Sequence, residues 1–467
     1  MVQVDEIAER LGVQVVSARH GVAIDEVEHD SRCVGPRTLF ACIPGAVVDG
    51  HDFAVAAVEA GACALLVERR LPLDVPQLLV PSVRQTIGPV AAMVHGDPSE
   101  VIDVVGVTGT NGKTTTVRIA GALLTTLGRR VTEIGTLTGE RTTPEAPELQ
   151  RQLAAARAAG HQAVVMEVSS HALDQHRVDG TRFRVAAFTN LGVDHLDHHG
   201  TMEAYFDAKA SLFTPGLSDR AIIDTTTEAG RRLADRTQIP AVILGPESVA
   251  DIEHSSTGSR FRWRGHDVFV PLVGAFNVTN AVIAAEIVVS LGFEPAAVVS
   301  ALSELDGVPG RFETVDAGQD FMIVVDYAHT PDGLEAVLRA ARQLTTRTLT
   351  VVFGAGGDRD AGKRPQMGEV ARRLADRVVV TNDNPRNESP DAIISAIVAG
   401  MSQPPERIEP DRRLAIRHAI AGARSGDLVL IAGKGHESTQ TVGAEVIDFD
   451  DREVARQEVA RLRGFES

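Results

Sequence analysis

The chain has 467 residues, too many for one ordinary hydrophobic core, and its length suggests about three domains. An apolar content of 43% and a charged content of 23% are typical of a soluble globular protein, and the formal charge of −17 argues against non-specific nucleic-acid binding. The N-terminal stretch MVQVDEIAERLG lacks the apolar core of a signal peptide, and no run reaches the ~18 apolar residues of a membrane span. Three cysteines without metal-like spacing favour a reducing compartment, so we expect a cytoplasmic protein.

Residues 1–98 predict a small α/β domain, in which turn residues separate short apolar runs. Strands are expected at 39–43, 64–67 and 78–80. Asp30, Ser31 and Arg32 precede the first of these runs. From periodicity alone, we favour the interpretation that these three residues cap and charge a turn.

Residues 99–308 predict a second domain, and a phosphate-loop motif stands near its start. An apolar run at 104–107 reads as a buried strand, breaks into TGTNGKT, and gives way to a helical pattern at Thr115. This order turns successive backbone N–H groups toward a phosphate. Lys113 would reach the outer phosphates, and the Thr114 hydroxyl would reach a magnesium ion. The strict motif requires glycine where this chain has Val107, so the match is to a variant.

Polar residues follow other strands of this domain. The strands expected at 163–166, 185–188 and 221–223 run into Glu167, Thr189 and Asp224. Strands that alternate with helical patterns indicate a largely parallel sheet, and ligands of such sheets bind beyond the carboxyl ends of the strands. The sequence further predicts a surface hairpin around 261–264 and a buried helix over 277–291, with Asn277 near its cap.

Residues 309–467 predict a third domain in which four more strands end in polar motifs. The strands are expected at 322–325, 349–353, 378–380 and 428–431, and DYAHTPD, GAGGDRD, NDNPR and GKGHE follow them. Four such ends are hard to explain as surface decoration. The tail from Asp450 predicts a charged helix at the surface.

A phosphate loop implies a nucleotide with magnesium, a hard ion that prefers oxygen ligands. Thr114 and the carboxylate of Glu167 are therefore the candidates. Histidine is a less usual magnesium ligand, so His195 is a weaker candidate for a metal ligand on these grounds. The grouping of His195, His198 and His199 could suggest zinc, but the absence of a nearby cysteine or an H-E-x-x-H spacing disfavours it.

Two α/β domains whose strand ends face each other fit a hinged enzyme that transfers a phosphoryl group. This chemistry requires positioning and charge neutralisation more than covalent help, and Lys113 and Arg311 are candidate neutralisers. Lys209 lies on a helical pattern, where most lysines extend to water.

Taken together, these residues resemble the ATP-dependent Mur ligases along essentially the full chain. Thirteen blocks occur in one order, which is far more specific than a single motif, and Val107 is normal in the phosphate loop of that family. The blocks are DSRCVGPRTLFACIPG, DGHDF, TGTNGKTTT, TTPE, EVSSHALDQHRVDG, FTNLGVDHLDHHG, YFDAKASLF, GAFNVTNA, GVPGRFE, DYAHTPD, GAGGDRDAGKRP, DNPR and GKGHE.

The resemblance implies an α/β protein of three domains: a small N-terminal domain for a uridine nucleotide (1–98), a central P-loop ATPase with a mainly parallel sheet (99–308), and a C-terminal Rossmann-like domain that binds an amino acid (309–467). It implies a ligase of peptidoglycan precursor synthesis that uses ATP and Mg²⁺. ATP would phosphorylate the free carboxylate of UDP-N-acetylmuramoyl-L-Ala-D-Glu, and an incoming amino group would attack the acyl phosphate. We expect these small-molecule substrates, no nucleic-acid partner, and a monomer.

The resemblance also assigns residues around ATP and the metal. Lys209 falls where the family carries a carbamylated lysine (N6-carboxylysine), an oxygen donor for Mg²⁺. Thr114, Glu167 and His195 would complete the metal ligands, and Lys113 would join Glu167, His195 and Lys209 in catalysis. The ATP pocket would comprise Gly109, Thr110, Asn111, Gly112, Lys113, Thr114, Thr115, Asn280, Arg311 and Asp326.

Substrate contacts carry over in the same way. Ser31 would face the uridine nucleotide. The muramoyl dipeptide would be held by Thr142, Thr143, Ser169, Gln175 and Arg177. The DNPR segment resembles the form that accompanies meso-diaminopimelate, because Arg386 offers a bidentate guanidinium to a second carboxylate. The amino-acid pocket would be completed by Arg359, Asp383, Asn384, Pro385, Gly433 and Glu437, with Glu437 receiving the distal ammonium.

Two departures from the family and three alternatives remain. The segment 136–142 is shorter than usual, and Asn382 stands where an aspartate is common. A member that adds L-lysine or another amino acid is disfavoured by Arg386. The N-terminal block and DNPR disfavour a folylpolyglutamate-type ligase. An inactive binding partner is disfavoured by the intact catalytic residues. His329 and Asp326 are candidates to accept the proton of the attacking amine.

Overall fold

Six parallel strands form the sheet of the central domain, in the order β13-β12-β11-β8-β10-β9. The middle strand, β8 (Asp103–Thr108), pairs with β10 (Ala163–Glu167) on one side and with β11 (Val185–Phe188) on the other. The strand order therefore reverses at β8, and a ligand site is expected beyond its carboxyl end. The structure is a computed structural model that describes residues 1–16, 21–45, 47–139 and 141–464.

Helices cover both faces of the central sheet. Val105 and Val107 of β8 pack with helices α4, α10 and α11, whereas Val104 packs toward α5, because successive side chains of a strand point to opposite faces. The remaining elements of this region are η3 (Pro98–Glu100), α4 (Lys113–Thr126), β9 (Val131–Ile134), α5 (Ala146–Ala158), α6 (Ser170–Asp174), α7 (Leu196–His199), α8 (Met202–Ala210), η4 (Ser211–Phe213), β12 (Ala221–Asp224), α9 (Glu228–Arg236), β13 (Ala241–Leu244), η5 (Pro246–Ser248), β14 (Ala250–Ser255), β15 (Gly258–Trp263), β16 (His266–Val270), α10 (Ala275–Ser290) and α11 (Pro295–Ser303).

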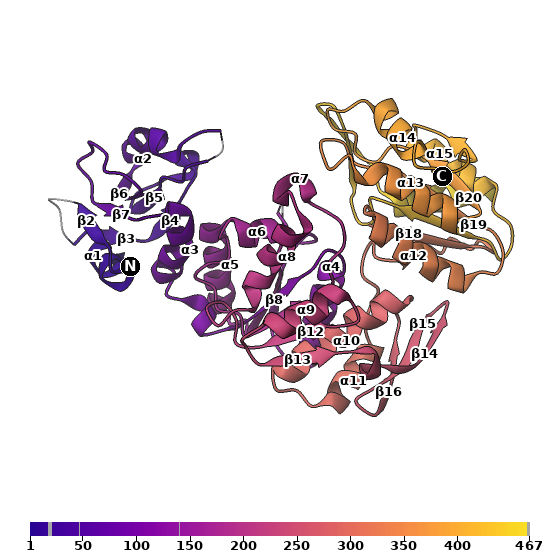
Figure 1. Ribbon diagram of the computed structural model, residues 1–467, viewed down its shortest axis with the longest axis horizontal. Helices are drawn as coiled ribbons and strands as arrows, with labels where there is room; N and C mark the ends of the chain where they lie inside the picture. The colour runs from indigo at the N-terminus through magenta and orange to yellow at the C-terminus, as the bar shows by residue number, and fades with distance from the viewer. Residues whose placement is uncertain (17–20, 46, 140, 465–467) are drawn as a thin grey trace.

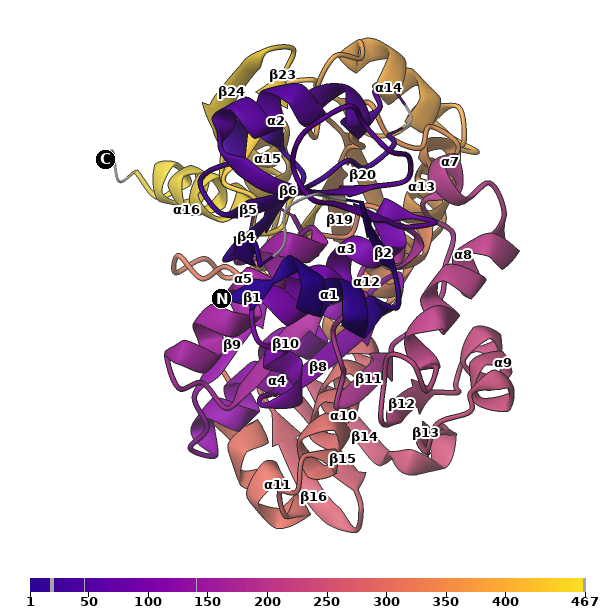
Figure 2. The same cartoon turned by 90° about the vertical axis from the view of Figure 1, so that its left-hand side faces the viewer.

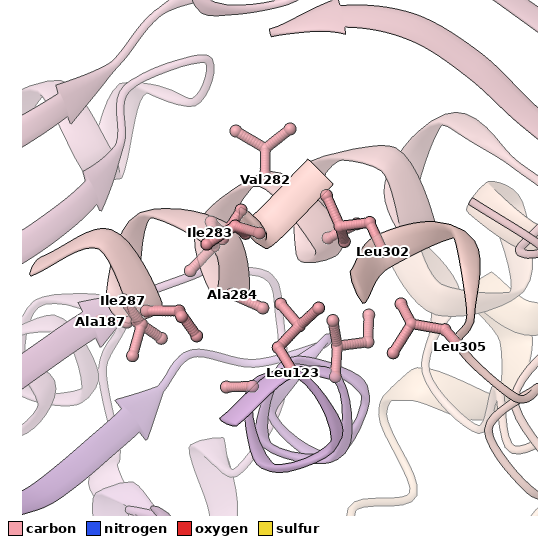
Figure 3. Packing of buried hydrophobic residues seen from close by; sticks show 14 of the residues in the cluster. Leu123, Ala187, Val282, Ile283, Ala284, Ile287, Leu302 and Leu305 are labelled. Carbon is pink, nitrogen blue, oxygen red and sulfur yellow. The ribbon is translucent and has the colours of Figure 1, made fainter. Parts of the chain in front are cut away.

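Helix α10 corresponds to the buried helix that the sequence predicts over 277–291. Figure 3 shows Ile283 and Ile287 of α10 above Leu123 of α4, with Leu302 of α11 beside them. The helix is confirmed, but it begins at Ala275 and not at Asn277. Gly274 occupies the N-cap with φ +99°, a left-handed conformation that favours glycine.

The hairpin predicted around 261–264 forms between β15 and β16, but the expectation that it lies at the surface is wrong for one of its faces. Phe261 and Trp263 are 2% and 1% exposed and join the core of α4 and α10. The indole N–H of Trp263 donates to Glu286 of α10 at 3.0 Å. The alternation of β15 therefore places its aromatic residues inward and its arginines outward.

The C-terminal domain contains a six-stranded sheet in the order β17-β18-β22-β19-β20-β21, parallel except for β17. Both faces are covered by helices, as parallel sheets require. Its elements are β17 (Glu313–Thr314), β18 (Met322–Asp326), α12 (Pro331–Leu344), β19 (Leu349–Phe353), α13 (Lys363–Leu374), β20 (Arg377–Val380), α14 (Pro390–Val398), β21 (Arg407–Ile408), α15 (Arg412–Ala421), β22 (Leu428–Ala432), the hairpin β23 (Thr439–Val442) and β24 (Glu445–Asp448), and α16 (Asp451–Leu462).

The N-terminal region carries a five-stranded sheet in the order β2-β7-β6-β5-β4. Its elements are β1 (Val2–Gln3), α1 (Val4–Leu11), β2 (Gln14–Val16), β3 (Ala23–Ile24), β4 (Glu26–Glu28), η1 (Ser31–Cys33), β5 (Thr38–Ala41), η2 (Gly50–Phe53), α2 (Ala54–Ala60), β6 (Ala62–Val67), β7 (Gln77–Leu79) and α3 (Val83–Val94). The Asp30 carboxylate accepts from the Arg32 backbone N–H at 3.0 Å and caps η1, so the turn-capping interpretation of this segment is confirmed.

The three sheets follow one another in an arc, with the central domain between the other two (Figure 1). Seen from the N-terminal side, the N-terminal domain lies in front of the C-terminal domain (Figure 2). The predicted α/β class with three domains is confirmed, whereas the predicted boundaries near 98 and 308 stay predictions. Within the described residues, no helix combines the length and apolarity needed to cross a membrane.

Two helices differ from their predicted form. Helix α4 begins at Lys113 and not at Thr115, so the lysine stands in the first turn. Helix α16 is not a purely surface helix, because Val454 and Val459 on its inner face are 2% and 1% exposed and pack against α15.

A buried ion pair joins α15 and α16 beneath the C-terminal sheet. Arg412 binds the Asp451 carboxylate twice, through Nε at 2.8 Å and Nη2 at 2.7 Å, and both side chains are 0% exposed. The same guanidinium donates to the carbonyl oxygens of Asn382 and Ala432 at 3.1 and 2.9 Å. Asn382 follows β20 and Ala432 is the last residue of β22, so the ion pair also restrains the ends of these two strands.

We expect Asp451→Ala to destabilise the C-terminal domain by about 3–5 kcal/mol, because it leaves a buried guanidinium unpaired. The matched control is Arg339→Ala, which removes an ion pair whose arginine is 59% exposed and should cost less than about 1 kcal/mol. Urea denaturation followed by circular dichroism measures both. Equal shifts for the two variants would contradict the role given to the buried pair.

Candidate active site

The phosphate-loop motif forms a tight loop between β8 and α4. Gly109 has φ +153°, and a Cβ there would lie 1.9 Å from the Thr189 hydroxyl oxygen, while Gly112 has φ +86° and faces Asn280. Asn190, which follows β11, accepts from the Asn111 N–H through its side chain at 2.9 Å and from the Thr110 N–H through its carbonyl at 3.0 Å. The loop is thereby held open toward the first N–H groups of α4, which have no partner within the helix.

The two lysines of the site converge on the same loop carbonyl. Lys113 donates from Nζ to the carbonyl oxygens of Gly109 and Thr110, each at 2.9 Å, and Lys209 donates to that of Gly109 at 2.8 Å. Lys209 is 1% exposed and does not extend to water, so the ordinary expectation for a helical lysine is wrong here. Burial and the nearby Lys113 charge hold the pKa of Lys209 well below its usual range, which favours a neutral amine.

Glu167, the last residue of β10, connects three separate segments. Its Oε2 accepts from the Thr114 hydroxyl at 2.9 Å, its Oε1 from the Thr136 N–H at 2.8 Å, and its carbonyl oxygen from the Thr143 hydroxyl at 2.9 Å. The residue is 1% exposed. Thr114 and Glu167, predicted from the sequence as metal ligands, therefore lie in contact and offer adjacent oxygen atoms.

His195 lies at the N-terminus of α7, next to these groups, with the left-handed φ of +54°. Its Nε2 is 3.5 Å from the Asp194 carboxylate, and burial lowers the pKa of its imidazole to about 3, so the ring is neutral near pH 7. Asp194 is itself 3.8 Å from Nζ of Lys363, which belongs to the C-terminal domain. A second contact between these domains runs from the Val193 N–H to the Asp332 carboxylate at 3.2 Å.

The residues expected at the muramoyl dipeptide lie beside Glu167. The Thr143 hydroxyl accepts from the Ser169 N–H at 3.0 Å, and the Thr142 and Thr136 hydroxyl oxygens are 3.1 Å apart. Arg177 donates to the side-chain oxygen of Gln175 at 2.6 Å and to the carbonyl oxygen of Thr143 at 3.3 Å. The short segment 136–142 contains Glu140, which lies outside the described residues. Ser31 belongs to the N-terminal sheet domain, in η1.

A linker brings the C-terminal domain onto the phosphate loop. Arg311 donates from Nη2 to the Thr114 hydroxyl at 3.0 Å and stacks over the Tyr327 ring at 4.2 Å. The Asp326 carboxylate, at the end of β18, accepts from the N–H groups of Phe312 and Ala328, each at 2.7 Å. Burial raises the pKa of Asp326, although Arg311 and these hydrogen bonds oppose the shift. Asp326 thus holds the linker, and Arg311 touches the predicted ATP site.

The DNPR loop meets the GKGHE loop in a second polar cluster. Asn384 donates to the Glu437 carboxylate at 2.8 Å, and its side-chain oxygen accepts from the Thr441 N–H at 2.9 Å. Gly433, with φ +117°, leaves room for Asp383, because a Cβ would lie 2.3 Å from the Asp383 carboxylate. Oδ2 of Asp383 is buried without a hydrogen-bond partner in the described part of the chain.

Arg386 stands at the edge of this cluster with φ +51°, an unusual conformation for a side chain of its size. Its Nη1 donates to the Gly357 carbonyl at 2.8 Å, and no carboxylate in residues 1–16, 21–45, 47–139 and 141–464 lies within ion-pair distance of it. Arg359 is exposed, and its side chain also lies near Gly356. The guanidinium of Arg386 therefore retains N–H donors that have no partner within the described residues.

Three buried residues near the site were not predicted from the sequence as site residues. Lys434, between two glycines, is fully buried and donates to the Glu437 carboxylate at 3.0 Å and to the Thr439 carbonyl at 2.6 Å. Lys363 and Tyr205 were likewise missed. The Tyr205 hydroxyl is 3.1 Å from that of Thr110, and Lys209 lies 4.6 Å from the Tyr205 ring centre. For Lys434, the GKGHE motif after a predicted strand was the available signal.

Most of the predicted residues fall into two groups, and Ser31 lies apart from both. Those around the phosphate loop and the dipeptide segment contact one another, and Arg311 joins them through Thr114. Those of the amino-acid pocket form the separate DNPR cluster. Thr115 is buried in the first turn of α4, and Pro385 lies between Asn384 and Arg386. Ser31 makes no contact with either group among the hydrogen bonds of the described residues.

Comparison with known proteins places the chain in a family. Models of the Mur ligase family catalytic domain, the Mur ligase middle domain and the Mur ligase glutamate ligase domain match residues 23–97, 107–288 and 310–435. UDP-N-acetylmuramoyl-L-alanyl-D-glutamate--2,6-diaminopimelate ligase of Syntrophomonas wolfei is 43% identical, covering 97% of this chain and 98% of the relative. The ligase of the same name from Geobacillus kaustophilus is 45% identical, with 93% and 94% covered.

A solved structure of a ligase with that name agrees with the fold. It has a TM-score of 0.71 and 32% identity, and the match covers 98% of this chain and 99% of that one. Three domain models in the expected order, together with full-length relatives above 40% identity, confirm the predicted resemblance. The chain belongs to the Mur ligase family and is a ligase.

Proposed function

We propose that this ligase adds meso-diaminopimelate to UDP-N-acetylmuramoyl-L-Ala-D-Glu, using ATP, in the synthesis of the peptidoglycan precursor. ATP phosphorylates the free glutamate carboxylate, and the amino group of diaminopimelate attacks the acyl phosphate, so that an amide forms and phosphate leaves. The observation that carries the proposal is the contact of Arg311 with Thr114, which brings the domain of Arg386 onto the phosphate loop. The relatives named for this reaction, at 43–45% identity, support it.

The phosphate loop supplies the binding and charge neutralisation that phosphoryl transfer requires. The N–H groups at the start of α4 bind the ATP phosphates, and Lys113 turns from the loop carbonyls to the outer phosphates. Arg311 neutralises charge from the opposite side. Asn280 lies against Gly112 at the same end of α4 and lines the ATP pocket.

Residues of the site fit a magnesium ion. Glu167 and Thr114 offer hard oxygen atoms at 2.9 Å from one another, and Lys209 and His195 lie beside the same loop. When bound, Mg²⁺ would offset the negative charge of the phosphates. Glu167 holds Thr114 in place for this purpose, and neutral His195 keeps a lone pair free for a ligand.

Lys209 is proposed to carry a carboxylate as N6-carboxylysine. Its neutral amine attacks carbon dioxide, an N–C bond forms, and the amine loses one proton to water. The carbamate replaces a buried neutral amine with an anion next to Lys113, so that the two side chains attract each other. The modified side chain then presents oxygen atoms to the metal site.

The DNPR cluster is proposed as the site of the amino-acid substrate. Arg386, Arg359 and Asn384 recognise its carboxylates, with Arg386 acting as a bidentate donor to the distal one. Glu437, Asp383 and the backbone at Gly433 receive the distal ammonium, and the unpartnered Oδ2 of Asp383 is available for it. L-lysine lacks the second carboxylate and would leave Arg386 unpaired.

His329 suits the role of proton acceptor for the attacking amine better than Asp326 does. The pKa of His329 is lowered to about 4 by burial, so its ring is neutral near pH 7. Its Nδ1 lies 2.9 Å from the Tyr327 carbonyl, which fixes the proton there and leaves Nε2 as the acceptor. Both oxygens of Asp326 are already engaged by N–H groups. We further propose that the protein acts as a cytoplasmic monomer.

Turnover with competing amino acids tests the assignment. With ATP, Mg²⁺ and the nucleotide dipeptide, we expect phosphate release with meso-diaminopimelate to exceed that with L-lysine by at least about tenfold, because a charge-assisted bidentate pair with the half-buried Arg386 is worth more than about 1.4 kcal/mol. Mass analysis of the product from a mixture of both amino acids identifies the residue added. Preference for lysine would refute the substrate assignment.

Arg386→Ala should reduce kcat/KM for meso-diaminopimelate by at least about thirtyfold, since truncating one partner of a desolvated charge pair costs about 2–5 kcal/mol. The KM for ATP should change less than about threefold, because Arg386 does not contact the phosphate loop. Arg407→Ala, an exposed arginine on β21 of the same domain, is the matched control. Equal losses for both substrates would count against the role of Arg386.

Lys209→Ala should lower kcat by at least about a hundredfold, because it removes a positioned charged group from the site. Acetate or another short carboxylic acid should partly restore activity to this variant by occupying the vacated space. Intact-protein mass spectrometry of the native chain should detect the added carboxyl group. A fully active Lys209→Ala variant would contradict carbamylation as a requirement.

A further inference from the structure

Four side chains that the proposed reaction does not use gather between α6 and α7. His171 and Asp174 belong to α6, and His198 and His199 belong to α7. The ring centres of His171 and His198 are 4.2 Å apart, and those of His198 and His199 are 4.7 Å apart. Two single-turn helices, separated by more than twenty residues of chain, thus meet through imidazoles and one carboxylate.

Three of these residues direct ligand atoms at a common point. One ring nitrogen each from His198 and His199 and one carboxylate oxygen of Asp174 all lie within 4.8 Å of one another. Nε2 of His198 is 2.9 Å from Oδ2 of Asp174, and Nε2 of His199 is 3.0 Å from the Ser170 hydroxyl. His198 is thus held by Asp174 and His199 by Ser170, and ligand atoms of His198, His199 and Asp174 still converge on one point.

The chemistry of this donor set selects the kind of ion. Two imidazole nitrogens and one carboxylate oxygen suit Zn²⁺ and similar transition metals, whereas Mg²⁺ prefers oxygen ligands throughout. The carboxylate of Asp174 is 51% exposed and the ring of His198 is 28% exposed, so an ion can enter from solvent and keep water as a fourth ligand. Because Asp174 comes from α6, the three residues share no local spacing in the sequence.

We propose that Asp174, His198 and His199 form a binding site for a divalent transition-metal ion of the zinc type, distinct from the magnesium site at Glu167. The ion would join α6 to α7. Helix α6 leads from Ser169 to Gln175, and α7 follows His195 directly, so the ion would restrain both segments that border the substrate site. Its His171 neighbour packs over the ligand rings and limits their rotation.

Calorimetric titration of the metal-free full chain with Zn²⁺, in the presence of excess Mg²⁺, tests the proposal. We expect one ion per chain, and at least about tenfold weaker binding for His198→Gln and for Asp174→Asn, because each removes a ligand. His266→Gln changes a histidine on β16, away from the cluster, and should bind as the native chain does. Circular dichroism confirms that each variant is folded.

A second measurement separates this site from the magnesium site. Zn²⁺ should raise the thermal midpoint of the native chain and of His195→Ala, but not that of His198→Gln, because only an ion bound to the native state stabilises it. Absence of Zn²⁺ binding to the native chain would overturn the proposal. Loss of binding in His195→Ala, with retention in His198→Gln, would also overturn it, because the ion would then occupy the magnesium site.

Discussion

The arrangement of the site depends on the buried carboxylate of Glu167. Its two oxygens and its backbone carbonyl accept hydrogen bonds from the phosphate loop, from the segment after β9, and from the paired threonines that precede α5. A buried carboxylate that satisfies three segments at once cannot move without leaving polar groups unpaired, and each such group costs about 1–3 kcal/mol. The relative positions of the nucleotide loop and the dipeptide segment are therefore fixed before any ligand binds.

Three basic side chains lie near this carboxylate. Lys113, Lys209 and Arg311 approach one loop, and the lysines are partnered by carbonyl oxygens in place of carboxylates. Desolvation of such groups is unfavourable unless an anion arrives. The phosphates of ATP and a carbamate on Lys209 would both supply that anion. Basic side chains thus gather where negatively charged ligands are proposed to bind, although the chain as a whole has a charge of −17.

The sequence predicted the parts of the site that are local in the chain. Apolar runs that break into polar residues located the ends of β8, β10 and β11 but not that of β9, and the resemblance assigned most side chains around Glu167. What it could not predict depends on contacts between distant residues. Lys434 is buried because the hairpin β23–β24 covers it, and Asp174 meets His198 because two short helices cross. The buried face of β15 was missed since one aromatic strand can pack inward or outward until its neighbour, α10, is placed.

The β23–β24 hairpin holds Arg386 and Asp383 through the backbone. The Arg386 N–H donates to the Thr441 carbonyl at 3.1 Å, and its own carbonyl accepts from the Gly443 N–H at 2.7 Å. Gln440 donates to the Asp383 carbonyl at 2.6 Å. These bonds hold Arg386 at its positive φ, a conformation that costs energy and persists only when the surroundings enforce it. The backbone position of Arg386 is therefore set by β23, and an arginine at this position without the hairpin would not be held in the same conformation.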